Sequence, residues 1–134
     1  MNSGPMPPTA DQVLGMMRQK MGDVLPAWAE SLKDLAPDLL VATGMTSAQS
    51  VGREASTIPP KYRHLMAVAA ALGRGQANCA RSQAYMAKQA GATREEVIDS
   101  VRIARHLAAA GILDASWLVL QDLGKEGSRQ NSSP

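Results

Sequence analysis

The one cysteine of the chain, Cys79, lies near the expected start of a helix in GRGQANCARSQAYMAKQAGATREE, residues 73–96. Unpaired backbone N–H groups and the positive end of the helix dipole favour an anion at such a position. A thiolate is stabilised there, and Arg81 is near enough in sequence to add to the effect. Free cysteine is also among the most buried residue types and commonly behaves as a small hydrophobe. The sequence therefore makes Cys79 a candidate catalytic nucleophile and leaves a purely structural thiol as the alternative.

Two glutamines accompany the cysteine on the same predicted helix face. Gln76, Cys79 and Gln83 are spaced by three and four residues, which places their side chains on one side of a helix. Neutral amides can hydrogen-bond a ligand, but they cannot take up a proton as a histidine or glutamate would. We predict that Gln76 and Gln83 bind substrate, with ordinary solvated glutamines as the competing interpretation.

The chain has two histidines, and their positions suggest different roles. His64 precedes the apolar run LMAVAAAL, so it can face inward at the mouth of a buried helix. Close to Cys79 it would act as a base or stabilise the thiolate, which makes it a second candidate catalytic residue. A partly exposed polar residue at a helix start is the alternative. His106 lies near the C-terminal end of its predicted helix, where positive charge is favourable, and receives no role.

Motifs for metals, cofactors and nucleic acids are missing from the sequence. There is no CxxC pair, no HxxxH or carboxylate cluster and no GxGxxG, and GRGQ lacks the Lys-Ser/Thr of a phosphate-binding loop. The basic residues are scattered and the net charge is only +2, which does not favour nucleic-acid binding. We therefore predict no metal, no cofactor and no nucleic-acid partner.

The expected location is the cytoplasm, without a membrane partner. No basic segment followed by an apolar run opens the chain, and no stretch has 18 consecutive apolar residues. A single cysteine forms no intrachain disulfide, which fits a reducing compartment.

An all-α fold is predicted for the elements that must position these side chains. Hydrophobic residues make up 45% of the 134 residues, but aromatics make up only 3% and phenylalanine is absent. The core must therefore consist of Leu, Val, Ile, Ala and the eight Met residues, which commonly fill gaps. Small side chains let helices pack closely, and no segment shows the two-residue alternation of a strand.

The chain divides into three parts by composition. Residues 1–8 form an irregular lead-in with three prolines, residues 9–124 form a single helical domain, and the polar residues 125–134 form a mobile tail. Helical signals within the domain include first-turn prolines at 26 and 37, a buried Ala-rich helix over 65–72, a helix end at Gly91, a capping box of Thr93 and Glu96 opening a helix to about 111, and a last helix over 112–123 closed by Gly124.

The stretch from IPPKYRHL through GQANCARSQAYMAKQAGATREEVIDSVRIA resembles the carboxymuconolactone decarboxylase and alkylhydroperoxidase AhpD-like family over residues 58 to about 110. The shared frame is a lysine-arginine entry to an Ala-rich helix, a Cys-bearing helix, and then A-x-x-x-G-A-T-x-E-E-V. This resemblance implies an AhpD-like bundle of about six helices that assembles through apolar helix faces into trimers or hexamers. It also implies a small-molecule substrate.

The same resemblance shows how the candidate site departs from its relatives. The peroxidase branch uses a Glu before the buried helix, a CxxC pair and a His one turn beyond; these four positions fall on His64, Gln76, Cys79 and Gln83. Without a resolving cysteine, the dithiol cycle of that branch cannot close within this chain. The decarboxylase branch looks to a His near Gln83 for acid–base work, and a glutamine cannot shuttle protons at neutral pH.

Three functions remain open from the sequence. The first is a diverged AhpD-like protein that binds or transforms a small organic molecule without a metal. The second is a one-Cys, thiol-dependent peroxidase with Cys79 as the attacking thiolate, His64 as its base and the two glutamines orienting substrate. The third is a non-catalytic oligomeric module. Whether the protein is an enzyme of peroxidase-like or decarboxylase-like activity is left undecided by the residues.

Overall fold

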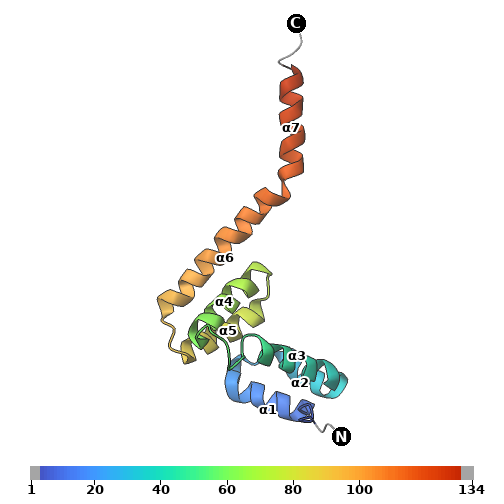
Figure 1. The fold of residues 1–134 in the computed structure, drawn as a ribbon, viewed down its shortest axis with the longest axis vertical. Helices are drawn as coiled ribbons and strands as arrows, with labels where there is room; N and C mark the ends of the chain where they lie inside the picture. Colours follow the sequence, from blue (N-terminus) through green and yellow to red (C-terminus); the bar gives the residue numbers. More distant parts are fainter. Residues whose placement is uncertain (1–3, 131–134) are drawn as a thin grey trace.

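The computed structural model describes residues 4–130, and every regular element in that range is a helix (Figure 1). The predicted all-α class is confirmed, with seven α-helices and one short 3-10 helix, η1, instead of about six helices. The elements are α1 (Ala10–Met21), η1 (Gly22–Val24), α2 (Ala27–Leu35), α3 (Pro37–Gln49), α4 (Pro60–Gly73), α5 (Ala77–Gln89), α6 (Arg94–Ala115) and α7 (Trp117–Gln130).

Helices α1, α2 and α3 pack together around one small apolar core. Its buried members are Val13, Leu14, Ala29 and Leu40. Gly44 allows α3 to approach α1, because a Cβ atom built on it would lie 2.6 Å from Cγ1 of Val13. That separation is well below van der Waals contact, so a side chain at position 44 would collide with Val13. The packing of this part of the core therefore depends on glycine at this position as well as on the buried apolar side chains.

Helices α4, α5 and α6 form a second group, in which α4 packs against both of the others. The buried residues of this group are small: Val68, Ala71, Ala80, Ser82, Ala87, Ser100 and Ala104. Small side chains let helix axes come close, as the Ala-rich composition predicts. The prediction of a buried helix over 65–72 is right for one face only, because Met66 on the outer face is 57% exposed.

The two groups of helices meet where α5 contacts α1 and η1. At this junction the hydroxyl of Ser82 donates a 2.7 Å hydrogen bond to the backbone carbonyl of Val24. Ser82 is only 2% exposed, and a buried hydroxyl needs such a partner. The bond therefore fixes the middle of α5 relative to the N-terminal helices.

Local sequence patterns predict most of the helix ends correctly. The side chains and backbone N–H groups of Thr93 and Glu96 form the predicted capping box at the start of α6. Helix α5 ends before Gly91, whose φ of +94° is the left-handed conformation that favours glycine. Pro37 is the first residue of α3, as predicted, whereas Pro26 is the N-cap of α2 and does not lie in its first turn.

The C-terminal helices differ from the sequence prediction in their ends. Helix α6 continues through Gly111 to Ala115, and α7 continues through Gly124 to Gln130. A glycine inside an exposed helix costs only about 1 kcal/mol, which is too little to end a helix with strong neighbours. Within the expected lead-in and tail, residues 4–8 are irregular and residues 125–130 are helical, while residues 1–3 and 131–134 lie outside the described part of the chain.

Candidate functional site

The candidate residues lie on α4 and α5, which form a tightly connected helical hairpin. The connection between the two helices is short, and Gly75 within it has a φ of +71°, which favours glycine. The hairpin folds α5 back along α4, and the two helices are in extensive contact. The first turns of α4 are thereby brought beside the middle of α5.

The structure brings His64 of α4 and Gln83 of α5 into direct contact. The Nδ1 atom of His64 lies 2.8 Å from Oε1 of Gln83, and the contact is partly buried. An amide oxygen can only accept a hydrogen bond, so Nδ1 carries the proton and donates it. In the neutral ring, a proton on Nδ1 leaves a lone pair on Nε2, and this is the tautomer that can act as a base.

Cys79 lies one helical turn before Gln83 on α5 and is half-buried. Residues four apart on a helix have Cβ atoms about 5–6 Å apart, so the thiol lies on the same side of α5 as the histidine contact. No hydrogen bond joins the thiol to His64 in the part of the chain that the structure describes. Cys79 and His64 therefore both flank Gln83 without forming a pair with each other.

The start of α5 has the features predicted for an anion-favouring position. Cys79 is the third residue of the helix, in agreement with its predicted place near the helix start. Gln76 occupies the N-cap, but its exposed side chain makes no capping hydrogen bond. Among the described residues, the N–H groups of Asn78 and Cys79 have no backbone or side-chain acceptor. The positive end of this helix is consequently open to a negative group, such as a thiolate or a bound ligand.

An ion pair fixes the start of α4 against the start of α6. Lys61 Nζ and Glu96 Oε1 are 3.0 Å apart. The backbone N–H of Thr93, followed by the Lys61 ammonium, lowers the pKa of the Glu96 carboxyl below its ordinary value. The hydrogen bond to Glu96 correspondingly raises the pKa of Lys61. Because His64 follows Lys61 by one helical turn, this contact helps to position the helix that carries the candidate base.

We expect the Glu96 contact to make the stability of the protein sensitive to acid. A carboxyl with a lowered folded-state pKa stabilises the protein fully above the ordinary glutamate pKa of about 4.3, and this stabilisation is lost as the pH falls through the folded-state value. The melting temperature of the wild type should therefore fall more steeply between about pH 5 and pH 3 than that of Glu96→Gln. Glu95→Gln, at the neighbouring exposed position, is the matched control and should follow the wild type; parallel curves for all three proteins would contradict the assignment.

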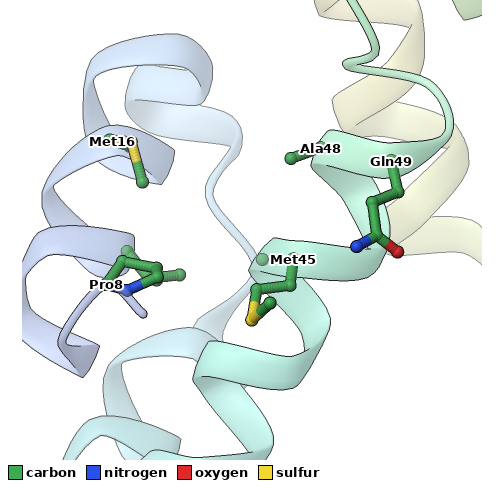
Figure 2. Close-up of a pocket in the computed structure, with 7 residues that line it drawn as sticks. Pro8, Met16, Met45, Ala48 and Gln49 are labelled. Carbon is green, nitrogen blue, oxygen red and sulfur yellow. The ribbon is translucent and has the colours of Figure 1, made fainter. Parts of the chain in front are cut away.

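Two cavities lie away from these residues. The first, of about 260 Å³, lies between α1 and α3 (Figure 2). The second, of about 340 Å³, lies between the segment after α3 and the outer face of α4. Neither cavity is lined by His64, Gln76, Cys79 or Gln83. The two glutamines predicted to bind substrate differ in their surroundings. Gln83 contacts His64, whereas Gln76 is exposed at the start of α5.

The first cavity could not be predicted from the sequence, for an identifiable reason. Figure 2 shows Met16 on the α1 side and Met45 on the α3 side, and these residues are 48% and 41% exposed. Methionines commonly pack in the core, and nothing in the spacing of these residues distinguishes a core methionine from one at the edge of a groove. The side chains that line the cavity are those of Pro8, Val13, Met16, Met45, Ala48 and Gln49.

Comparison with known proteins places the chain in a family. Among the described residues, no group of three or more His, Cys, Asp or Glu side chains could hold a metal ion. No curated protein matches the chain. The pattern of the carboxymuconolactone decarboxylase family matches residues 39–122, which is more than half of the chain and includes all four candidate residues. The chain therefore belongs to the carboxymuconolactone decarboxylase family.

Proposed function

We propose that the side of α5 bearing Cys79 and Gln83, together with His64, binds and transforms a small organic molecule through proton transfer, without a metal. The observation that carries the proposal is the 2.8 Å hydrogen bond between His64 Nδ1 and Gln83 Oε1. In the neutral imidazole this bond selects the tautomer with a lone pair on Nε2, and orientation by a second side chain is a common requirement for a general base.

The roles of His64 and Gln83 in this proton transfer follow from their chemistry. His64 Nε2 would accept a proton from the substrate, and the resulting imidazolium would still donate its Nδ1–H to Gln83. Gln83 positions the ring but does not titrate, so a single group carries the proton. The family resemblance places a Glu and a His at these two positions in the peroxidase branch. An imidazole and an amide would then stand in place of a carboxylate and an imidazole.

A second function is favoured by the half-buried thiol at the open start of α5. In this one-Cys reaction the Cys79 thiolate attacks the terminal oxygen of a hydroperoxide and the O–O bond breaks. The thiolate becomes a sulfenic acid, and the departing alkoxide takes a proton to leave as an alcohol. Two molecules of an external thiol then return Cys79 to the thiol, releasing a disulfide and water. In the third alternative, an oligomeric module, none of these side chains reacts.

A binding screen with matched variants tests these alternatives. Thermal unfolding is followed with a panel of small lactones, keto acids and organic hydroperoxides, since a ligand that binds only the folded state raises the melting temperature. Under the main proposal the shift disappears in His64→Ala and is retained in Gln89→Ala, a variant of an exposed glutamine on α5. Consumption of hydroperoxide and thiol that depends on Cys79 would favour the second function. An absence of binding and of turnover across the panel would overturn both and favour the oligomeric module.

A further inference from the structure

One positively charged side chain, Arg63, lines the cavity of about 340 Å³ between the segment after α3 and the outer face of α4. We call this space the Arg63 cavity. Its other lining residues are apolar or carry a hydroxyl, so no carboxylate faces the guanidinium from the walls. The ion pairs within residues 4–130 do not include Arg63. A half-buried guanidinium without a counter-charge favours the binding of an anion.

The hydrogen bonds of Arg63 leave one edge of its guanidinium without an acceptor. The Nη1 atom donates to the backbone carbonyl of Arg53, which ties the segment after α3 to α4. The Nε atom is buried and has no hydrogen-bond partner among the described residues. In a guanidinium, Nε–H and one Nη2–H point the same way from one edge and together match the two oxygens of a carboxylate. This is the edge that Arg63 leaves unpaired.

The same edge of another arginine holds a carboxylate in this protein. The Nε and Nη2 atoms of Arg18 donate hydrogen bonds of 2.8 and 2.5 Å to the two carboxylate oxygens of Glu30. Arg18 thus has within the chain the partner that Arg63 lacks. A carboxylate from outside the chain would give Arg63 the same two hydrogen bonds.

A hydroxyl group adds a second donor to the Arg63 cavity. The Ser56 oxygen accepts a hydrogen bond of 3.2 Å from the backbone N–H of Ile58, and its own proton has no acceptor among the residues that the structure describes. The hydroxyl of Ser50 is already used, because it donates to the backbone carbonyl of Thr46. The unused polar groups of the cavity are therefore donors, which selects a ligand group that accepts hydrogen bonds.

The rest of the Arg63 cavity is apolar and elongated along α4. Arg63, Met66, Ala67 and Ala70 follow one another at intervals of three, one and three residues, which places them along one face of the helix. Met66 is 57% exposed, so its side chain is available for contact. Seven residues of helix span about 10 Å, roughly the length of an extended chain of about eight carbons. The charge lies at one end of this apolar row.

We propose that the Arg63 cavity binds a small organic carboxylate with an unbranched apolar body. The carboxylate accepts hydrogen bonds from Nε and Nη2 of Arg63, and the apolar body lies along the row from Met66 to Ala70. Because Nε is buried in the free protein, binding turns the guanidinium toward the cavity, and side-chain rotations of this kind are common. The site is separate from the one proposed at His64, since consecutive helical residues point about 100° apart.

The exposed apolar residues of α6 and α7 are the competing location for such a molecule. Ile112, Leu113 and Trp117 are 61–67% exposed. No single described helix is long and apolar enough to span a membrane, but Arg94–Ala115 and Trp117–Arg129, bent by 48°, pass the test of length and composition together. A molecule held there by apolar contact alone would not need a carboxylate, so an uncharged compound of the same length would bind equally well.

Calorimetric titration with octanoate, 1-octanol and acetate separates these two locations. Octanoate has both the carboxylate and the apolar body, 1-octanol has only the body, and acetate has only the charge. Octanoate should bind at least about ten-fold more tightly than either of the others, because a hydrogen-bonded charge pair contributes at least that factor. Equal affinities for octanoate and 1-octanol would overturn the proposal.

Substitutions at two positions test the role of the guanidinium. Arg63→Met should weaken octanoate binding at least about ten-fold, and Arg63→Lys should restore only part of the loss, because an ammonium keeps the charge without the paired donors. Arg63 also holds the carbonyl of Arg53, so a second variant leaves it in place. Met66→Glu offers Arg63 a carboxylate three residues away and should compete with octanoate, whereas Met66→Gln should not. Unchanged affinity in Arg63→Met, or equal affinities in Met66→Glu and Met66→Gln, would overturn the proposal.

Methionine methyl resonances report where octanoate binds. Octanoate should shift the methyl resonance of Met66 and leave that of Met45 unchanged, because Met45 lines the α1–α3 cavity, which has no charged lining residue. His64→Ala should bind octanoate as tightly as the wild type, so this test is independent of the function proposed at His64. A shift of Met45 without Met66, or binding that is lost in His64→Ala and retained in Arg63→Met, would contradict the assignment to the Arg63 cavity.

Discussion

Replacing Leu40 by alanine should lower the free energy of unfolding by about 2–5 kcal/mol, the usual loss when a buried leucine is truncated and a cavity is left. Leu40 is completely buried on α3 and is one of only four fully buried large side chains in the described part of the chain. Because the total stability of a domain is about 5–15 kcal/mol, this one change would remove a large share of it.

Leu39→Ala is the matched control for this prediction, because Leu39 is adjacent on α3 but 55% exposed. Its effect should stay within about 0.5 kcal/mol, as for most surface substitutions. Urea unfolding at one fixed protein concentration measures both variants, since any assembly makes stability depend on concentration. Equal losses in the two variants would show that the N-terminal helices do not form the core described above.

Truncating His64 should have the largest effect on function. For a compound that binds at the site, we expect His64→Ala to weaken affinity by about 10- to 100-fold, the loss expected for one hydrogen bond to a charged or strongly polarised group. Gln83→Ala should have a smaller effect, about 2- to 10-fold, because it frees the ring without removing it. Calorimetric titration gives both values.

The order of these two effects is the informative part of the titration. A greater loss in Gln83→Ala than in His64→Ala would mean that the amide, and not the imidazole, makes the principal contact with the ligand. If both variants are folded by circular dichroism and both have unchanged affinity, the compound does not bind at the α4–α5 hairpin. Gln89→Ala again serves as the control on the same helix.

Features encoded over a few residues were predicted well from the sequence. The Thr93–Glu96 capping box, the helix end before Gly91 and the position of Cys79 as the third residue of α5 all depend on neighbours within one or two helical turns. The helix ends expected at Gly111 and Gly124 were wrong because a glycine weakens a helix only slightly, and the strength of its neighbours decides the outcome.

Features that depend on contacts between residues distant in the sequence were predicted less well. The contact between His64 and Gln83 joins residues 19 positions apart, and the sequence suggested both residues without establishing their hydrogen bond. The sequence left open whether His64 pairs with Cys79, and the hydrogen bond of His64 goes to Gln83, one turn further along α5. The exposure of α6 and α7 could not be predicted either, because an apolar sequence shows that a surface needs covering but not whether its own chain covers it.

The most direct test of the proposed site is nitrogen-15 NMR of the His64 imidazole, recorded during titration with the compound that gives the largest thermal shift. We predict that the neutral ring of the free protein carries its proton on Nδ1, and that the compound shifts the Nε2 resonance of His64. Loss of the tautomer preference in Gln83→Ala would show that the glutamine orients the ring. The opposite tautomer in the wild type would contradict the proposed site. So would a compound that shifts the resonances of the Met16 and Met45 methyl groups, in the α1–α3 cavity, while those of His64 stay unchanged.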